Sequence, residues 1–588
     1  MDNRKIAQIL QEVGDILEIR GENPFRVNAY HNAAISILNF PKDLRDIVDE
    51  NPKLLEKIPG IGENLRQHIE ELVSTGACRE FEKIQKSIPH GLLEMLRIRG
   101  VGPKKVKLFY SQLKIKDLKG LERAAKDGVL ATLAGMGEKS QRDILEGLKE
   151  HSEFELERVL ISEALMEAEK YIKYMQKCKE VKRIEYAGSL RRRQETIGDI
   201  DLLATVGGVG AEEVMQHFVK YKEVMKVLAS GETKSAVILE SGIQVDLRVV
   251  DDNVFGAALH YFTGSKIHNI LIRDMAKKKG LKISEYGVFK IQKGKSRAKG
   301  EGKLIACKTE KDVFNAVGLP YIIPELRKGE DELQYALAQQ KAHKQLPKLI
   351  ELEDLKGDLH THSDWSDGRS SIEEMAKAYK AAGYKYIAMC DHSSVMGVTA
   401  GMSSKDIREQ WKEIDRINKG MKDFKILKGS EVDILKDGML DFKDDILKQL
   451  DIVVIAAHMY GRLPESQQMK RLIAAIENPY SKILAHPSGR MINRRGPMEI
   501  DMVKIIDACK ANNVVIEINS NPLRLDLTDR YVRIAKDKGV KIAINTDAHD
   551  ASQCELLKYG IFVARRGWLM KNDVINTYDL DKLLKFWE

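Results

Sequence analysis

The chain has 588 residues, and its 96 Lys and Arg against 88 Asp and Glu leave a formal net charge of +8. This length exceeds one ordinary domain, so about three to five domains are expected. The mild positive charge permits a nucleic-acid partner without requiring one.

The sequence also limits the compartment. Its N-terminus lacks the apolar core of a signal peptide, and no apolar run is long enough to span a bilayer. The 6 Cys are scattered without a Cys-x-x-Cys pair, which disfavours a cysteine zinc site and fits a reducing compartment. A cytoplasmic protein without a membrane partner is expected.

Three similar glycine-containing stretches recur in the N-terminal third: Ile58-Pro-Gly-Ile-Gly-Glu, Ile98-Arg-Gly-Val-Gly-Pro and Leu133-Ala-Gly-Met-Gly-Glu. Each precedes an amphipathic helical pattern. Glycines let the backbone approach a DNA phosphate, and the following helix presents its positive end. A single copy is equally an ordinary helix–helix turn, but three copies favour sequence-independent phosphate binding, the third being the weakest. The predicted DNA contacts are Gly60, Gly62, Gly100, Gly102, Lys104 and Lys105.

The apolar-x-Gly-x-Gly stretches resemble the helix-hairpin-helix motif. With Asn28-Ala29-Tyr30, the first hairpin makes residues 1–85 similar to the small N-terminal domain of family X DNA polymerases, and 86–150 would be a fingers-like hairpin region. In some members the small domain removes a deoxyribose phosphate through a lysine Schiff base. Here that position is His68, whose imidazole cannot form a Schiff base as an amine does, so lyase activity by that route is not expected.

Asp199 and Asp201 form a carboxylate pair near the middle of the chain. Two positions apart on a strand, they point to the same face and repel one another unless cations lie between them. Gly188-Ser189 upstream is a small-residue turn whose N–H groups can approach a phosphate, and Asp246 lies in a β-branched run that predicts a neighbouring strand. An Asp-x-Asp alone is common, but together these features indicate metal-assisted nucleotidyl transfer.

Two motifs resemble the palm of family X DNA polymerases: Gly-Ser-Leu-Arg-Arg-Arg…Gly-Asp-Ile-Asp within 185–201, and Tyr261-Phe-Thr-Gly-Ser265. The resemblance implies a palm over 151–275 and a thumb over 276–326. It also implies two Mg²⁺ or Mn²⁺ bound by Asp199, Asp201 and Asp246, with gapped or primer–template DNA and deoxynucleoside triphosphates as partners. The implied nucleotide-binding residues are Arg158, Gly188, Ser189, Arg192, Tyr261, Phe262, Gly264, Lys266, Asn269 and Arg273.

The sequence departs from the animal gap-filling enzyme of this family at two of these positions. Lys266 stands where that enzyme has Asp, and Gln244 where it has Arg, which removes a cation beside Asp246. The reaction type is therefore expected to transfer, but the kinetics and fidelity are not.

After a polar stretch over 327–355 that predicts a linker, short apolar strands alternate with helices. This rhythm predicts parallel βα units and a barrel. Residues of metal-binding type follow strand after strand. A lone buried His is more often a core residue, but side chains at the carboxyl ends of barrel strands converge, so the repetition favours a metal site.

His360-Thr-His362, Asp391-His392, His486-Pro and Asp547-Ala-His549 resemble the PHP (polymerase and histidinol phosphatase) domain. The resemblance implies a distorted (βα)7-type barrel over 356–575 with a 3'-5' exonuclease activity, and in some members cleavage at abasic sites. The implied ligands of about three Zn²⁺ or Mn²⁺ are His360, His362, Asp367, His392, Glu431, His458, His486, Asp547 and His549. Arg490 is either a contact for substrate phosphate or a surface arginine.

The whole chain is thus predicted to be a multidomain α+β and α/β protein in the arrangement of bacterial and archaeal family X polymerases. We expect a monomeric DNA-repair polymerase that fills short gaps and trims 3' ends. Two alternatives remain open. The barrel could hydrolyse pyrophosphate or a small phosphoester, or the chain could be a non-catalytic DNA-binding scaffold.

Overall fold

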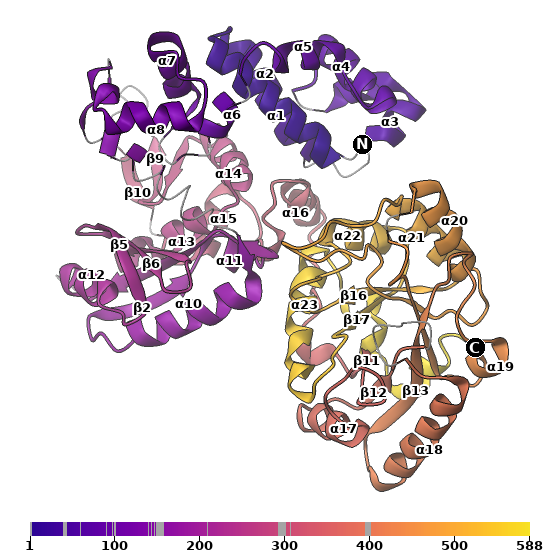
Figure 1. Cartoon of the computed structure of the whole chain (residues 1–588). Coiled ribbons are helices and arrows are strands. Elements are labelled where there is room, and N and C mark those ends of the chain that lie inside the picture. Colours follow the sequence, from indigo (N-terminus) through magenta and orange to yellow (C-terminus); the bar gives the residue numbers. More distant parts are fainter. Residues whose placement is uncertain are drawn as a thin grey trace.

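The computed structural model describes residues 3–38, 44–58, 60–89, 91–96, 98, 101–133, 135–138, 140–142, 144–145, 148, 158–207, 210–291, 302–305, 307–393, 401–461 and 463–588. Figure 1 shows a helical N-terminal part above a mixed α/β body, with a C-terminal barrel beside that body. No helix within these ranges has both the length and the apolar content needed to cross a membrane.

The N-terminal part consists of short helices around one core. They are α1 (Asn3–Arg20), α2 (Pro24–Leu38), α3 (Leu44–Glu50), α4 (Glu63–Thr75), α5 (Arg79–Gln85), α6 (Gly91–Met95), α7 (Pro103–Leu113) and α8 (Leu118–Lys126). Buried apolar residues from Ile6 to Leu148 form a single cluster. The core therefore continues across position 85, where the sequence predicted a boundary between two units.

The palm is a five-stranded sheet in the order β2-β4-β7-β6-β5. Its strands are β2 (Val181–Tyr186), β4 (Asp199–Val206), β5 (Val224–Ser230), β6 (Lys234–Leu239) and β7 (Gln244–Val250). The helices α10 (Ile161–Met175) and α12 (Ala211–Val219) contribute buried side chains to the same core as the sheet. A separate two-stranded ladder joins β1 (Val159–Leu160) to β3 (Thr196–Ile197), directly before the carboxylate pair.

The thumb region follows the palm sheet. It contains α13 (Phe255–Thr263), α14 (Lys266–Lys278), the sheet β8 (Leu281–Ser284), β9 (Gly287–Ile291) and β10 (Gly302–Ile305), and α15 (Glu310–Val317). The stretch predicted as a linker differs from that prediction, because it forms α16 (Glu332–Lys341) and fully buries Arg327. Glu332 is also buried and lies 2.9 Å from His268. The polar composition of this stretch predicted exposure, because it does not show that charged residues are paired inside the fold.

The C-terminal part is a seven-stranded parallel sheet in sequential order. The strands are β11 (Gly357–Thr361), β12 (Tyr386–Met389), β13 (Lys425–Asp433), β14 (Ile452–Ala456), β15 (Ile483–Leu484), β16 (Val515–Asn519) and β17 (Ile542–Asn545). The predicted strands are therefore present, and their fully buried apolar runs are typical of parallel strands covered on both faces. A parallel bridge between Thr361 and Ala548 brings the first strand against the end of the last, which nearly closes the barrel.

Helices cover the barrel: α17 (Ile372–Ala381), α18 (Ser404–Gly420), α19 (Asp444–Leu447), α20 (Glu465–Ile476), α21 (Met502–Ala511), α22 (Asp529–Asp537), α23 (Leu557–Arg566) and α24 (Leu580–Leu584). The predicted end at 575 is too early. Asn576 donates to the carbonyls of Gly357 and Ile544, and Tyr578 and Leu583 join a second barrel cluster. The last residues thus belong to the barrel.

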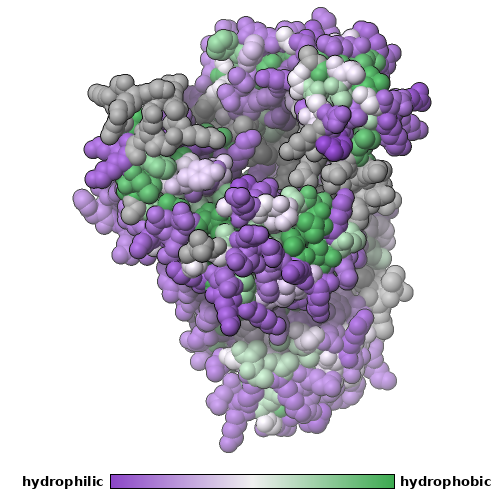
Figure 2. Space-filling view, turned by 90° about the vertical axis from the view of Figure 1, so that its left-hand side faces the viewer, coloured by the Kyte–Doolittle hydropathy of each residue, from purple (hydrophilic) through white to green (hydrophobic). Residues whose placement is uncertain are grey.

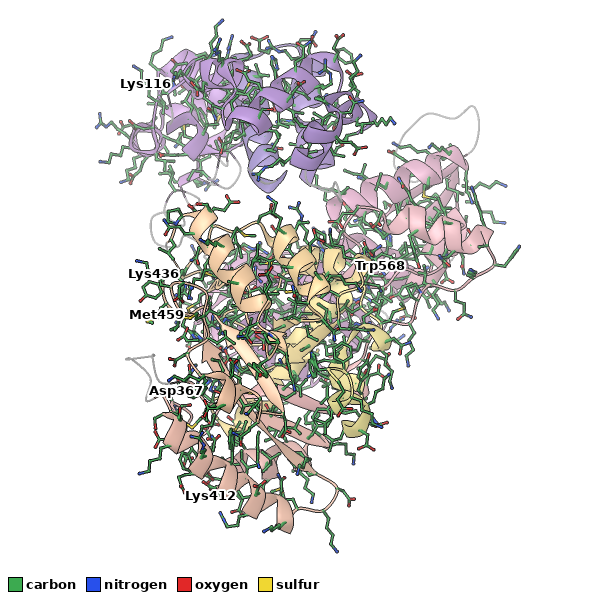
Figure 3. The ribbon with its side chains drawn as sticks, turned by 90° about the vertical axis from the view of Figure 1, so that its right-hand side faces the viewer. Lys116, Asp367, Lys412, Lys436, Met459 and Trp568 are labelled. Atoms are coloured by element: carbon green, nitrogen blue, oxygen red, sulfur yellow. The ribbon has the colours of Figure 1, made fainter. Side chains whose placement is uncertain are left out.

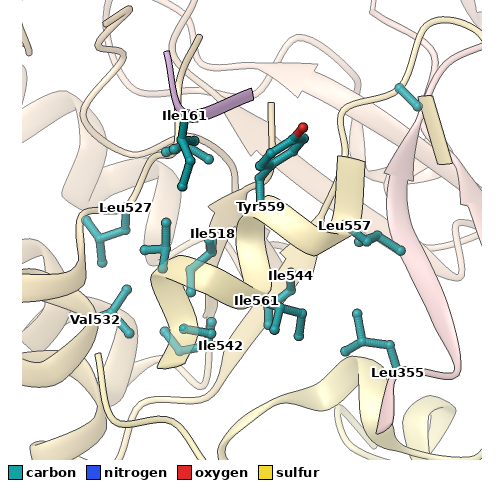
Figure 4. Packing of buried hydrophobic residues seen from close by; sticks show 14 of the residues in the cluster. Ile161, Leu355, Ile518, Leu527, Val532, Ile542, Ile544, Leu557, Tyr559 and Ile561 are labelled. Atoms are coloured by element: carbon teal, nitrogen blue, oxygen red, sulfur yellow. The ribbon is translucent and has the colours of Figure 1, made fainter. Parts of the chain in front are cut away.

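Palm and barrel share one hydrophobic cluster. Ile161 at the start of α10 packs with barrel residues such as Ile518 and Leu527 (Figure 4). Polar contacts surround this interface, including Lys328 to Asp529 at 2.6 Å and Arg565 to Glu325 at 2.9 Å. On the side of the molecule seen in Figure 2, the surface is mainly hydrophilic and its hydrophobic residues lie in separate patches. The polymerase-like body is therefore docked on the barrel rather than tethered to it.

Candidate active sites: palm carboxylates and a barrel metal cluster

The palm carboxylates converge as the alternation of side chains predicted. Strands β4 and β7 run parallel, and their register places Asp201 directly opposite Asp246, with Asp199 one pleat away. Burial, and next the charge of Asp246, raises the pKa of Asp199, while burial with Asp199 and Asp246 raises the pKa of Asp201 to about 7. Burial first, and then the repulsion between neighbouring carboxylates, thus disfavours the charged forms, and a bound divalent cation would favour them.

The turn beside these carboxylates requires glycine at one position. Gly188 has φ +58°, and a Cβ there would lie 2.2 Å from Asp201 Oδ2. Ser189 follows in the short helix α11 (Gly188–Arg191). Arg192 is half-buried next to Asp201, and loss of solvation lowers its pKa to about 10 although Asp201 opposes the shift. Arg192 also donates to the carbonyl of Thr263, beside Gly264. The Arg192 guanidinium and the Gly188 backbone thus lie beside the same carboxylate, Asp201.

Asp246 has two polar partners, Gln244 and Lys234, and Lys234 supplies the positive charge that Gln244 lacks. The amide of Gln244 donates to Asp246 Oδ1 at 2.6 Å, and Lys234 Nζ on β6 lies 3.3 Å from Oδ2. A cation is therefore present beside Asp246, supplied by a different strand. Lys234 was not predicted, because pairing of β6 with β7 is what brings it to the site.

The remaining predicted nucleotide contacts have the following partners in the structure. Arg158 bonds Thr196 Oγ1 at 2.9 Å and lowers the pKa of Asp199 against the effect of burial, so it lies at the carboxylate edge. Tyr261 and Phe262 stand edge to face with centroids 5.2 Å apart. Asn269 donates to the Tyr261 carbonyl at 2.7 Å, and Arg273 to the Asn269 carbonyl at 3.3 Å. Lys266 is exposed at the first turn of α14.

In the barrel, all the predicted ligands converge at the carboxyl ends of the strands. Eight of them fall into three overlapping groups that could each hold an ion: His362, Asp367, His392 and His549; His360, His362, Glu431 and Asp547; and His392, Glu431 and His458. The ninth, His486, has its Nε2 2.9 Å from Glu431 Oε1. Glu431 belongs to two of the groups and is 1% exposed, so it lies at the centre.

The donor set fits divalent cations. Fully buried His362 has Nε2 only 3.2 Å from His360 Nε2 and 3.1 Å from Asp547 Oδ1, and its Nδ1 has no hydrogen-bond partner among the described residues. Burial would lower the pKa of His392, but Glu431 and Asp367 outweigh it and raise that pKa to about 10. Such nitrogen atoms hold either a proton or a metal ion, so metal binding must release protons.

The comparisons agree with this geometry. Residues 1–78 match a helix-hairpin-helix domain, 92–150 a SAM-like helix-hairpin-helix tandem, 258–328 the DNA polymerase beta thumb, and 358–488 a PHP domain. The DNA polymerase/3'-5' exonuclease PolX of Bacillus subtilis (strain 168) is 36% identical over 588 residues, which cover 100% of this chain and 99% of that protein. This chain belongs to the PHP-containing family X DNA polymerases.

Two further relatives match shorter stretches of this family X chain. DNA polymerase lambda of Rattus norvegicus is 26% identical over 355 residues, 55% of this chain and 56% of that protein. A probable phosphatase of Thermoanaerobacter sp. (strain X514) is 30% identical over 244 residues, 39% of this chain and 93% of that protein.

Behind the metal-type residues lies a polar layer that the motifs did not reveal. Fully buried Glu517 accepts from His360 Nδ1 at 2.8 Å through one oxygen and from the His486 backbone N–H at 2.8 Å through the other. Asp433 lies 3.6 Å from His458 Nδ1. A carboxylate hydrogen-bonded to a ring nitrogen, as Glu517 is to His360, fixes the tautomer and orientation of a metal-binding imidazole. The available signal for Glu517 was a charged residue inside the apolar strand Val-Ile-Glu-Ile-Asn.

Arg490 has partners within the protein that its sequence position did not reveal. Its guanidinium pairs with Glu195 of the palm at 2.9 Å and donates to the backbone carbonyl of Arg524 at 2.9 Å. Three residues on, Asn493 donates to the Arg158 carbonyl at 2.6 Å. The loop after His486 is therefore a structural link to the palm. Sequence motifs could not show this, because both partners are several hundred positions away.

The three hairpins of this family X chain share one backbone hydrogen bond. Their first apolar carbonyl accepts the N–H three residues on, as in Ile61 to Ile58, Val101 to Ile98 and Met136 to Leu133. Gly62 and Gly102 cap α4 and α7, and a Cβ at either would meet no protein atom within 4 Å. Predicted contact Gly100 lies outside the described residues. Lys104 and Lys105 lie in the first turn of α7. His68 packs edge-on against Phe81, with centroids 5.4 Å apart.

Proposed function

We propose that this chain is a DNA-repair polymerase that fills short gaps and removes 3'-terminal nucleotides with its barrel. The single observation that supports this most is the presence of two separate centres, a palm carboxylate triad and a barrel cluster, in a chain that aligns end to end with a DNA polymerase/3'-5' exonuclease.

In the palm, Asp199, Asp201 and Asp246 would hold two Mg²⁺ or Mn²⁺. The backbone of Gly188–Ser189 and the guanidinium of Arg192 would bind the triphosphate, because both border the carboxylates. Tyr261 and Phe262 would lie against the incoming sugar. Gapped DNA would be gripped by the hairpins through its phosphates, without sequence preference.

In the barrel, the three ligand groups would hold about three Zn²⁺ or Mn²⁺, with Glu431 shared between two of them. Bound divalent cations supply an activated hydroxyl nucleophile and neutralise charge on a phosphate at such centres. Among the residues themselves, Glu517 would orient His360 through its hydrogen bond to the ring.

The test uses a gapped duplex with a labelled primer 3' end, in Mg²⁺ and in Mn²⁺. Asp199→Asn should abolish extension and leave shortening of the primer near wild type, while His360→Gln should do the reverse. If Asp199→Asn extended the primer as fast as wild type, the palm assignment would be wrong. If neither activity of the purified chain were detected and elemental analysis found no metal, the DNA-binding scaffold would be the better description.

A second candidate concerns the barrel alone. One relative, which matches 39% of this chain and 93% of its own length, is named a probable phosphatase, and this favours a small phosphoester as substrate. Hydrolysis of p-nitrophenyl phosphate and pyrophosphate, compared with shortening of a DNA 3' end in the same preparation, separates the two. Faster hydrolysis of the small esters, lost in His360→Gln, would favour the second candidate.

A further inference from the structure

We infer that the barrel has a nucleobase subsite beside its metal cluster, in which Tyr460 stacks on the base of the 3'-terminal nucleotide. This inference rests on the proposed exonuclease function and deepens it. The subsite is an open surface depression with a volume of about 370 Å³, lined by Leu435, Lys436, Asp437, Met459 and Tyr460. That volume lies within the range of small-ligand pockets, which is about 300–1,000 Å³.

The residues that line this depression are close in the sequence to ligands of the metal cluster. Leu435–Asp437 follow the end of β13, which contains Glu431, and Tyr460 is two residues beyond His458. A chain spans at most about 3.6 Å per residue, so the Cα atoms of Tyr460 and His458 are within about 7 Å. In Figure 3, Lys436 and Met459 lie at the same edge of the barrel as Asp367. A nucleotide whose phosphate reaches the cluster can therefore place its base here.

The Tyr460 side chain is more exposed than most large apolar side chains of the barrel. From residue 357 onward, the large apolar side chains that the described structure leaves most exposed are Met439 (63%) and Tyr460 (45%), and both belong to the loops that form this depression. One face of the Tyr460 ring covers the guanidinium of Arg471, 5.5 Å from the ring centroid. The rest of the ring is available to a flat ligand.

The two loops are held rigidly by a buried arginine. Arg471 of α20 is 1% exposed and donates to the carbonyls of Leu435 at 2.8 Å and Met459 at 2.9 Å. Gln468 donates to the carbonyl of Tyr460 at 2.7 Å. These hydrogen bonds fix the backbones of both loops, so the Tyr460 ring is preorganised. Preorganisation reduces the entropy lost when a base binds.

The charges favour a base over a second phosphate. Lys436 and Asp437 both line the depression and are both exposed, so their opposite charges leave no net positive field for an anion. Asp437 also accepts the Met439 N–H at 3.0 Å, which orients it within the hairpin. Adjacent donor and acceptor side chains with an aromatic ring suit the polar edge and flat face of a nucleobase, and stacking is tolerant of base identity.

The test compares DNA with an ordinary 3'-terminal nucleotide and DNA whose terminal residue is a tetrahydrofuran abasic analogue. Tyr460→Ala should lower kcat/KM for the ordinary end by roughly 5- to 150-fold, the range that corresponds to loss of one stacked base, and leave the abasic end unchanged. Tyr460→Phe should remain near wild type on both ends. Product inhibition by dAMP should exceed that by deoxyribose 5-phosphate in wild type and equal it in Tyr460→Ala.

The matched control is Tyr286→Ala, which removes another exposed tyrosine, 66% exposed, from the thumb region. Metal content measured in every variant detects damage to the neighbouring His458. Equal cleavage by wild type and Tyr460→Ala on both ends would overturn the subsite, as would an equal loss on both ends or a loss of metal. A wild-type chain that shortens neither DNA would instead refute the proposed exonuclease function.

Discussion

Replacing Glu310 by Gln should weaken the contact between the thumb and the palm turn that contains Gly188 and Ser189. Glu310 is 6% exposed and accepts from Arg191 Nη1 at 2.9 Å and Nη2 at 2.7 Å, and from Arg327 Nη1 at 2.5 Å. Arg191 belongs to the turn that contains Gly188 and Ser189, whereas Glu310 and Arg327 both lie in the stretch 258–328 that matches the thumb. One carboxylate therefore connects the palm turn to the thumb.

The expected cost of this change is about 3–5 kcal/mol, the usual range for breaking a buried ion pair by removing one partner. Two buried guanidinium groups would lose their counter-charge, and the new amide N–H group would face other donors. Burial alone would raise the pKa of Glu310, but Arg327 and Arg191 outweigh it and lower that pKa to about 2. The stability that ionised Glu310 contributes is therefore complete above the pKa of an unfolded Glu, about 4.3. It is lost as the pH falls towards the folded pKa of about 2.

Several domains do not unfold as one two-state unit, so hydrogen exchange is the better assay. Peptides that contain residues 188–192 and 310–327 should exchange faster in Glu310→Gln, and KM for deoxynucleoside triphosphate should rise while shortening of DNA 3' ends is kept. The control is Asp445→Asn, which removes an exposed carboxylate 2.9 Å from Arg408 and should have little effect. Equal exchange of both peptides in wild type and Glu310→Gln would refute the reasoning.

Three other changes have distinct expected results. Gly188→Ala places a Cβ against the Asp201 carboxylate and should reduce incorporation by about 100-fold with nuclease activity intact, measured on one gapped substrate; unimpaired incorporation would contradict the close contact. Glu517→Gln weakens the acceptor for His360 and should lower the metal affinity of the barrel by about 10- to 100-fold, measured by competition with a chelator; unchanged affinity would show that this carboxylate has no orienting role. Arg490→Ala removes a bond to the palm and should raise the nucleotide KM several-fold while leaving 3'-end cleavage within about twofold; the opposite pattern would restore Arg490 as a contact for the cleaved phosphate.

Local periodicity was enough to predict much of this protein. The two-residue repeat of a strand placed Asp199 and Asp201 on one face, and the register of β4 with β7 confirmed Asp246 as their neighbour. The rhythm of apolar strands predicted the barrel, and since the carboxyl ends of its strands meet, the convergence of its His, Asp and Glu residues was predictable as well. Each of these patterns depends on residues close together in the chain or on the symmetry of a repeated unit.

Only the tertiary structure decided the partners of these groups. Lys234 reaches Asp246 because β6 pairs with β7, and Glu517 reaches His360 from 157 positions away. Arg490 is a bond between domains, and the polar stretch from 327 is packed rather than extended. The physical reason is common to all of them. A charged residue has the same local pattern whether water or a distant side chain surrounds it, so its partner is determined by packing and not by sequence spacing.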